Sequence, residues 1–148
     1  MGLTAELGRF VASLQPDAWP PAATATVRRG IADCVGVAFA GANEAVVARA
    51  RPLAQPAATG EARLWLEPRF AAAPDAAFFN AVAAHALDFD DTGLDGHPSV
   101  VLAPVVLAEA ERLGRTWSEA VTAYVAGYET WAELIRRDAD KHHGKGWH

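Results

Sequence analysis

The feature that most constrains the fold of this chain is a helical spacing of apolar residues. Its longest example spans residues 117–135, where apolar side chains return every 3.6 residues through about five turns. Thr116 and Glu119 have the spacing of a capping box at the start of this segment. Arg136 and Arg137 lie near its end, where cations interact favourably with the helix dipole. The pattern predicts a long helix with one buried face.

Four other segments carry similar patterns. Residues 3–14 and 27–39 each show one apolar stripe at helical spacing. Residues 100–113 are apolar on nearly every side, which predicts a helix buried all round. In the fourth segment, residues 74–89, the predicted apolar face consists of Phe78, Val82, Ala86 and Phe89. Together with the long helix, these segments predict an all-α helical bundle.

Proline, glycine and serine mark the ends of these helices. Pro21 suits the first turn of the second helix, and Gly41 suits its end. Ser99 is the expected N-cap of the helix over residues 100–113, and Gly114 is expected to end it. These signals divide the chain into separate helices joined by short connections.

The least helical part of the sequence is the stretch of residues 52–74. It contains several prolines and a glycine, which disfavour a continuous helix. We expect a short helix before it, within residues 44–53, and a short extended piece inside it at residues 63–66.

The composition indicates one folded domain. The 148 residues are 51% hydrophobic, so the chain can bury a core without disulfides or metals. The net charge of -5, without a basic stripe, argues against nucleic-acid binding. The single cysteine, Cys34, excludes an internal disulfide and suits a reducing compartment. The sequence shows neither a signal peptide nor an apolar run long enough to span a membrane, so we expect a cytoplasmic protein.

One segment concentrates the side chains that can do chemistry. Residues 85–97 contain two imidazoles and, within four positions, three carboxylates; these side chains are His85, Asp88, Asp90, Asp91 and His97. If the preceding helix continues to Asp91, then His85, Asp88 and Asp91 follow one another at three-residue steps, and Asp88 lies four residues before Thr92. Carboxylates so close repel one another, and a proton held by one of them relieves the repulsion. This is a common device for making a general acid or base.

His97 stands just before a predicted helix. Backbone N–H groups and the helix dipole at such a position attract anions, for example the carboxylate of a substrate. The same segment also fits an ordinary helix end, because Asp-Asp-Thr-Gly is common turn chemistry and His85 borders an apolar face. The residue types alone leave both interpretations open.

Two other functions fit parts of this segment. His85, Asp88, Asp91 and His97 are acceptable ligands for zinc or iron, but their spacing matches no established ligand pattern. Residues 88–92 fit the D-x-D-x-T loop of haloacid-dehalogenase phosphatases. That loop follows a hydrophobic parallel strand, whereas residues 76–84 form an alanine-rich helical pattern, and alternating strands and helices are missing. We reject the phosphatase interpretation.

The C-terminal residues form a second candidate group. Cations and imidazoles cluster there with two glycines, and could receive the carboxylates of a substrate; they are Lys141, His142, His143, Lys145 and His148. The alternative is a solvated chain end, which is the usual state of a terminus.

Several blocks of this sequence resemble the MmgE/PrpD family, which includes 2-methylcitrate dehydratase and cis-aconitate decarboxylase. The main blocks are AAFFN at 76–80, AHALDFDDT at 84–92 and HPS at 97–99. Further similar blocks, in the same order, are DCVG at 33–36 with Gly41, AGYE at 126–129 and GWH at 146–148. The resemblance extends over nearly the whole chain.

The resemblance implies a fold, a reaction and a site. Full-length members complete the helical bundle with more helices and a smaller α/β domain, and the active site lies between the two domains. The reaction removes water or carbon dioxide from a small di- or tricarboxylate, without metal or organic cofactor. The positions that match catalytic residues are Asp88, Thr92, His97 and His148. The candidates for substrate binding around them are His85, Asp91, Ser99 and Lys145.

The roles within this set stay open. Asp88 or a histidine is the candidate base, and His97 or His148 is the candidate acid or carboxylate anchor. The loop between Thr92 and His97 is one residue shorter than in the decarboxylases of the family, so the resemblance does not fix the substrate.

The chain also ends well before a typical family member does, and the lysines that the family places further along are absent. We therefore expect residues 1–148 to form a single, incomplete MmgE/PrpD-type helical domain, inactive alone. We expect it to pair with a separately encoded C-terminal complement or with other copies of itself, through exposed apolar surface. The alternative is a non-catalytic helical module that binds a carboxylate or a partner protein.

Overall fold

A computed structural model describes residues 2–55, 60–138, 140 and 142–146 of the chain. Most of them are helical, which confirms the predicted all-α class. The α-helices are α1 (Leu3–Ser13), α2 (Pro21–Ala40), α3 (Ala45–Ala50), α4 (Ala73–His85), α5 (Pro98–Leu113) and α6 (Trp117–Arg137). The remaining elements are strands β1 (Ala62–Arg63) and β2 (Phe70–Ala71) and the 3₁₀ helix η1 (His142–Lys145).

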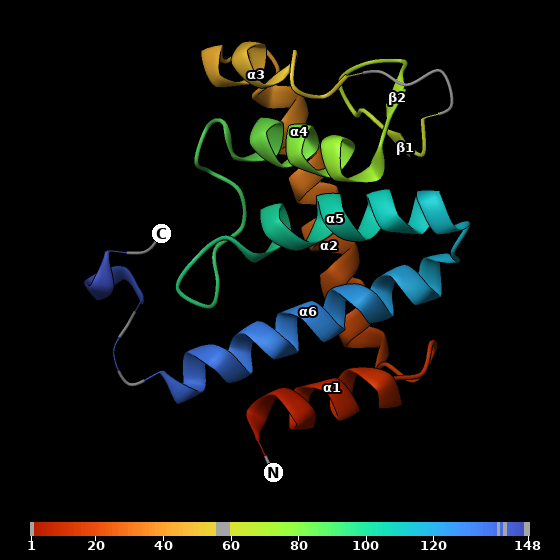
Figure 1. The fold of residues 1–148 in the computed structure, drawn as a ribbon, viewed down its shortest axis with the longest axis vertical. Coiled ribbons are helices and arrows are strands. Elements are labelled where there is room, and N and C mark those ends of the chain that lie inside the picture. Colours follow the sequence, from red (N-terminus) through yellow and green to blue (C-terminus); the bar gives the residue numbers. More distant parts are fainter. Residues whose placement is uncertain (1, 56–59, 139, 141, 147–148) are drawn as a thin grey trace.

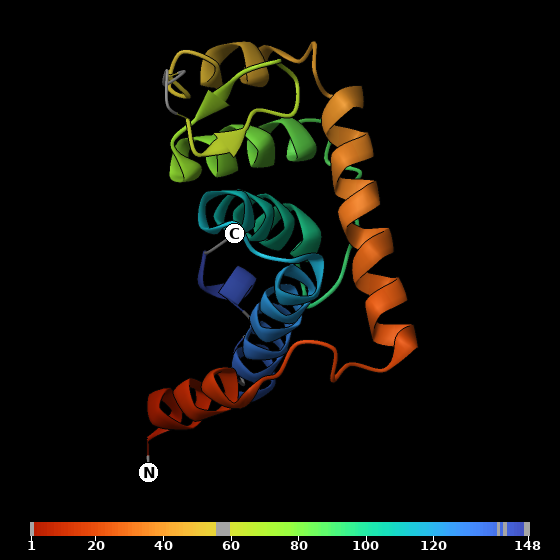
Figure 2. The same cartoon turned by 90° about the vertical axis from the view of Figure 1, so that its right-hand side faces the viewer.

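Three helices form a stack, and α2 crosses one side of it. In Figure 1, α4, α5 and α6 lie one below another, with α3 above α4 and α1 beneath α6. Figure 2 shows α2 running along the back of this stack. α5 packs against both α4 and α6, and α2 packs against all three. The core therefore lies between α2 and the stack, and no described helix covers the opposite side of α4 and α5.

The predicted helix ends agree with the structure at most positions. α2 begins at Pro21 and has Gly41 as its C-cap. Gly114 ends α5 in the left-handed conformation, with a φ of 60°, which glycine adopts without strain. The capping box of α6 forms as predicted: the Thr116 hydroxyl accepts the N–H of Glu119, whose side chain accepts the N–H of Thr116.

The predicted apolar face of α4 is wrong for Phe78 and Phe89, whereas Val82 and Ala86 are partly buried and pack against the core. Phe78 and Phe89 are 48% and 61% exposed, and Phe89 lies beyond the end of the helix. Because α4 packs against α2, α3 and α5, its buried positions are mostly small residues that let these helices approach closely. The buried residues of α4 are Ala73, Ala76, Ala77, Phe79, Asn80, Ala83 and Ala84.

The proline-rich stretch forms a small two-stranded sheet attached to α4. β1 pairs antiparallel with β2, Ala62 facing Ala71 and Arg63 facing Phe70. The buried side chain of Asn80 accepts the N–H of Trp65 and donates to the carbonyl of Arg63. The expected extended piece is therefore present, but its paired residues begin one position earlier than residues 63–66.

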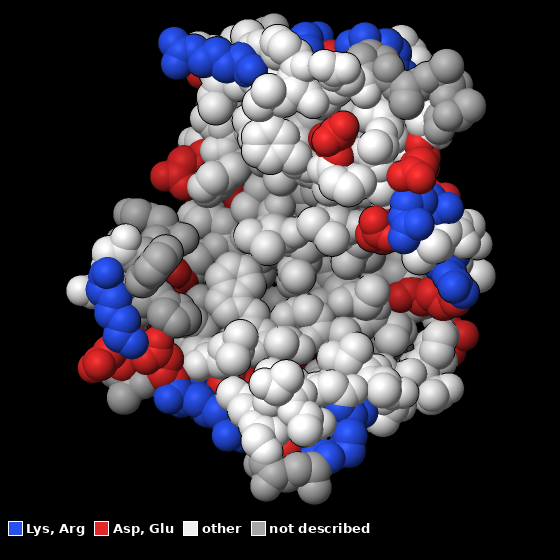
Figure 3. Space-filling view, in the orientation of Figure 1, with Lys and Arg blue, Asp and Glu red and all other residues white. Residues whose placement is uncertain are grey.

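The prediction that α5 is buried on every side is also wrong. Val101 and Val105 are each 52% exposed. Together with Phe78 and Val82 of α4, they line an apolar groove of about 670 Å³. Figure 3 shows this face of the molecule, hollowed in its middle and with charged side chains mainly around its margins. Exposed apolar surface of this kind is typical of a site that another element or molecule covers.

None of the helices in the described part of the chain is both long and apolar enough to cross a membrane.

Candidate active site

The candidate site is built on the loop that joins α4 to α5. The helix over residues 74–89 was predicted to continue to Asp91 in one arrangement of the site, but α4 ends at His85. Asp88 then takes the left-handed conformation, with a φ of 53°. Aspartate tolerates this conformation better than most residues, and it reverses the chain. The proposed three-residue steps along one helix face are therefore not formed.

A tight turn closes the loop and returns it to α5. The backbones of Gly93 and Gly96 exchange two hydrogen bonds of 2.9 Å, and the two residues between them, Leu94 and Asp95, have positive φ. This is the pattern of a type I′ turn. A side chain at Gly96 would lie 3.1 Å from the ring of Trp131 on α6, so the turn packs directly against that helix.

The returning loop brings two imidazoles and two carboxylates together. The Asp90 carboxylate has one oxygen 2.9 Å from His85 Nδ1 and the other 3.3 Å from His97 Nδ1. The Asp88 carboxylate lies on the other side of the rings, 3.4 Å from His97 Nε2 and 3.8 Å from His85 Nε2. The two rings meet edge to face with centroids 4.7 Å apart. We call these four residues the histidine–aspartate cluster.

The two carboxylates of the cluster have different surroundings. The side chain of Asp90 has no exposed surface, whereas that of Asp88 is 77% exposed. The second oxygen of Asp90 and Nδ1 of His97 are buried and make no well-aligned hydrogen bond with any described residue, although they lie 3.3 Å apart. A buried carboxylate is costly without donors, so Asp90 favours a proton on Nδ1 of each imidazole.

Cys34 of α2 lies beneath this part of the loop. Burial raises the pKa of its thiol to about 12, with further contributions from Asp90 and Asp91. The thiol is therefore protonated at neutral pH and is not a nucleophile there.

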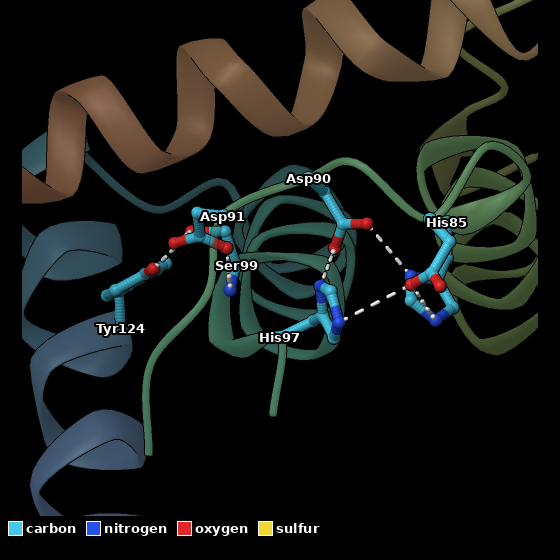
Figure 4. Close-up of polar contacts among 7 residues, drawn as sticks. His85, Asp90, Asp91, His97, Ser99 and Tyr124 are labelled. Atoms are coloured by element: carbon cyan, nitrogen blue, oxygen red, sulfur yellow. Dashed lines mark hydrogen bonds and ion pairs between the residues drawn. The ribbon is translucent and has the colours of Figure 1, made fainter. Parts of the chain in front are cut away.

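Asp91 points away from the cluster, although it follows Asp90 directly. Figure 4 shows Asp90 directed at the two imidazoles and Asp91 directed at Ser99 and Tyr124. One oxygen of Asp91 accepts the backbone N–H of Ser99 at 3.0 Å, and the other accepts the Ser99 hydroxyl at 2.5 Å. The carboxylate of Asp91 thus occupies the N-terminus of α5, where a substrate carboxylate was expected.

The predicted N-cap of α5 is a further correction. α5 begins at Pro98, with His97 as its N-cap, and Ser99 lies inside the first turn. Proline suits the first helical position because it lacks the N–H that would be unsatisfied there. The side chain of Ser99 is completely buried.

An open cleft of about 1040 Å³ lies above the cluster. His85, Asp88, Thr92 and His97 line it together with Trp131. Thr92 also lines a second cavity of about 580 Å³, between α2 and α6. The structure therefore brings three of the four predicted catalytic residues, and His85, to one cleft. It places Asp91 and Ser99 in a separate network.

Of the C-terminal candidates, the structure describes only the side chain of Lys145, and it does not join this site. Lys145 lies in η1, and its Nζ is 2.8 Å from Asp138 Oδ1. It is not among the residues that line the cleft. Lys141 and His148 lie outside the described residues, as do the side chains of His142 and His143. The assignments of Lys145 and His148 stay predictions.

Asp90 is the site residue that the sequence prediction missed. On a continuous helix it would lie five residues beyond His85 and would face away from it. The signal that points to Asp90 is the Asp-Asp-Thr-Gly turn chemistry, which favours a loop over a helix at these residues and lets consecutive carboxylates point in opposite directions.

The histidine–aspartate cluster is also the group that could hold a cation. One ligand atom from each of its four residues lies within 4.8 Å of the others, with Asp90 in the place predicted for Asp91. A tetrahedral zinc ion with bonds of about 2.0–2.2 Å holds its ligand atoms only about 3.3–3.6 Å apart. The cluster instead pairs imidazole nitrogens with carboxylate oxygens directly, which is the arrangement of an acid–base group.

Comparison with known protein families shows which family the chain belongs to. Residues 5–148 match the MmgE/PrpD N-terminal domain, and the matched segment includes every residue of the cluster and of the cleft. The chain belongs to the MmgE/PrpD family. A search of curated proteins found no significant match.

Family membership confirms the resemblance seen in the sequence blocks. The described helices agree with an all-α MmgE/PrpD N-terminal domain. In this family member, the block AHALDFDDT supplies the end of α4 with His85 and the loop with Asp88, Asp90 and Asp91. The block HPS supplies His97 and the start of α5.

Proposed function

We propose that this MmgE/PrpD chain supplies the acid–base groups of a cofactor-independent carboxylic-acid lyase. The proposed substrate is a small di- or tricarboxylate related to 2-methylcitrate or cis-aconitate. The observation that carries the proposal is the buried Asp90 carboxylate, which faces two imidazoles at the base of an open cleft. Such a carboxylate fixes the tautomer and orientation of a catalytic imidazole.

The roles follow from the two ends of each imidazole. Asp90 accepts a hydrogen bond from Nδ1–H of His85 and faces Nδ1 of His97, so both Nε2 atoms are left to exchange protons on the side of Asp88. Asp88 is the exposed carboxylate that a substrate can reach. We propose that His97 and Asp88 exchange protons with the substrate and that Asp90 orients the imidazoles.

Both candidate reactions use these groups in a balanced way. In a dehydration, the base takes a proton from the carbon next to a carboxylate, the electron pair forms the C=C bond, and the hydroxyl leaves as water with a proton from the acid. In a decarboxylation, the C–C bond to a carboxyl group breaks, carbon dioxide leaves, and the electron pair left on carbon takes a proton from the acid. The same acid–base pair serves either reaction.

The proposal includes a completing segment. The cluster carries two carboxylates of its own, so a polyanionic substrate needs more positive charge than the described cleft offers. The match is to an N-terminal domain, and the apolar groove of α4 and α5 is open to solvent. We propose that a C-terminal segment, joined to this domain or separately encoded, covers the groove and supplies the cations.

The open groove also supports a second candidate function. A helical module that only binds a partner needs apolar surface such as Phe78, Val101 and Val105, and does not need a buried carboxylate between imidazoles. Such a module would bind its partner equally well after Asp90→Asn.

Turnover by the purified complex of this chain with a C-terminal MmgE/PrpD segment tests the proposal. We expect release of water or carbon dioxide from a 2-methylcitrate- or cis-aconitate-like acid. Asp90→Asn should abolish turnover, and Asp75→Asn, which changes a carboxylate in the first turn of α4, should preserve it. A complex that forms but is inactive in the unsubstituted protein would refute the lyase proposal and support the binding module.

A further inference from the structure

Asp91, Ser99 and Tyr124 form a hydrogen-bonded chain that joins three parts of the molecule. Asp91 belongs to the loop after α4, Ser99 to the first turn of α5, and Tyr124 to the middle of α6. The Ser99 hydroxyl donates its hydrogen bond to Asp91. The 2.7 Å contact between the Ser99 and Tyr124 oxygens therefore has the Tyr124 hydroxyl as donor and the Ser99 oxygen as acceptor. The chain therefore runs from α6 through α5 to the loop (Figure 4).

The Ser99 and Tyr124 part of this chain is buried, whereas Asp91 is half-buried and lines the cavity of about 580 Å³ between α2 and α6. Ser99 has no exposed surface and Tyr124 is 5% exposed. Burial raises the pKa of Tyr124, so its hydroxyl keeps its proton at neutral pH. Gly30 of α2 closes the network from behind, since a side chain there would begin 2.6 Å from the Ser99 oxygen and 3.1 Å from the Tyr124 oxygen. Ser99 itself is not among the residues that line the neighbouring cavity.

The position of this network in the chain gives it a specific effect. Asp91 lies between Asp90 and Thr92, and Ser99 lies two residues after His97. The loop from 86 to 97 has no regular secondary structure besides the Gly93–Gly96 bridge. Its shape near the cluster therefore depends on the anchor that Asp91 makes to α5 and α6.

We propose that Asp91, Ser99 and Tyr124 are positioning residues that hold Asp90 and His97 in the geometry of the histidine–aspartate cluster. We call the three residues the aspartate clamp. This role replaces substrate binding for Asp91 and Ser99. Its effect on turnover rests on the proposed lyase function, whereas its effect on the geometry of the cluster does not.

The test measures the contact between the two imidazole rings in the folded chain. The ring centroids of His85 and His97 are 4.7 Å apart, close enough for a cross-peak between ring protons in a nuclear Overhauser spectrum. We expect this cross-peak to weaken in Ser99→Ala and in Tyr124→Phe. The matched control is Thr122→Val, which removes another hydroxyl of α6, one that bonds Trp19 Nε1 and the Ser118 carbonyl away from the cluster.

The outcomes separate the clamp from general stability and from the lyase proposal. A weaker cross-peak in both clamp variants, with Thr122→Val unchanged, supports the clamp. An unchanged cross-peak in folded Ser99→Ala and Tyr124→Phe overturns it, and so does equal weakening in all three variants. If Ser99→Ala does not fold, Tyr124→Phe decides.

A kinetic measurement on the active complex adds a second test. Tyr124→Phe should lower kcat by up to about a hundredfold, the cost of misplacing a group by about 1 Å, with a smaller change in KM. A rise in KM alone would overturn the positioning role. Absence of turnover in the unsubstituted complex would refute the lyase proposal. The cross-peak between the His85 and His97 rings would then be the measurement that supports or overturns the aspartate clamp.

Discussion

Two neighbouring carboxylates, Asp90 and Asp91, serve opposite sides of one loop. On the Asp90 side, one carboxylate oxygen and His97 Nδ1 are buried 3.3 Å apart without a well-aligned hydrogen bond, next to an open cleft. On the Asp91 side, both carboxylate oxygens accept hydrogen bonds from Ser99, whose side chain has no exposed surface. Buried polar groups without complete hydrogen bonding beside a cleft are typical of catalytic sites. A fully hydrogen-bonded buried network is typical of interactions that stabilise the fold.

The comparison shows how a loop without regular structure can hold reactive groups. Alternating side chains along the loop let one residue anchor the backbone while the next one faces the cleft. The same substitution at the two positions should therefore affect different properties of the protein.

The largest expected effect is on turnover. Asp90→Asn keeps the shape of the side chain but removes the charge that orients both imidazoles. We expect a loss of about 100- to 10,000-fold in kcat of the complex, the usual contribution of a positioned acid or base. The steady-state rate on the proposed acid measures it. A loss below about tenfold would show that Asp90 does not serve the chemistry.

The second expected effect is on stability and falls on the other side of the loop. Ser99→Ala leaves an oxygen of Asp91 and the Tyr124 hydroxyl without a partner. A buried polar group left unsatisfied costs about 1–3 kcal/mol, so the free energy of unfolding should fall by at least that amount. Urea denaturation of Ser99→Ala and Thr122→Val measures the difference. If the free energy of unfolding falls less in Ser99→Ala than in Thr122→Val, the Asp91 side of the loop has no special role in stability.

The third expected effect is on the pH dependence of stability and comes from Cys34, which is buried beneath both carboxylates. Its pKa of about 12 exceeds the ordinary value of 9.0, so the folded state binds the thiol proton more tightly than the unfolded state does. This contribution is fully present below pH 9 and is lost as the pH rises towards 12. At about pH 10 the loss is on the order of 1 kcal/mol.

The measurement compares the pH dependence of unfolding in the unsubstituted chain and in Cys34→Ala. We expect the free energy of unfolding to fall more steeply above pH 9 in the unsubstituted chain. Parallel curves would mean that the thiol is not held in its neutral form by burial beside the loop.

A smaller effect is expected at the capping box of α6, which lies away from both sides of the loop. Thr116→Ala removes the N-cap hydroxyl and should cost about 1 kcal/mol of stability. Thermal melts measure this loss, and the His85–His97 ring contact should stay unchanged. A change in that contact would show that any loss of stability loosens the site.

The smallest expected effect is that of metal chelation. Treatment of the active complex with a chelator should leave kcat unchanged, because the imidazoles and carboxylates of the cluster pair with one another. Loss of turnover that added zinc or iron restores would replace the acid–base proposal with metal-assisted chemistry.

The sequence predicted those helix ends that are determined by neighbouring residues within one turn. Thr116 and Glu119 satisfy each other within one turn, and Gly114 ends α5 by its own conformational freedom, so their roles could be predicted from a few residues. The family resemblance, carried by consecutive blocks, placed Asp88, Thr92 and His97 at one site.

The errors arose where distant parts of the chain decide the structure. Ala86 and Phe89 continue the apolar spacing of α4, but the helix stops because Asp88 reverses the chain and Asp90 turns towards His85 and His97. Phe78 was expected in the core, but the close packing of α2 on α4 buries alanines instead. The role of Asp91 depends on Ser99 and Tyr124, which no spacing pattern links to it.

The central claim is that Asp90, and not Asp91, faces Nδ1 of both imidazoles. The proton-bearing ring nitrogens of His85 and His97, observed by ¹⁵N–¹H spectroscopy of the folded chain, test it most directly. We predict protons on both Nδ1 atoms in the unsubstituted protein and in Asp75→Asn, and a shift or loss of both signals in Asp90→Asn. Protons on both Nε2 atoms, or signals that do not respond to Asp90→Asn, would contradict the account.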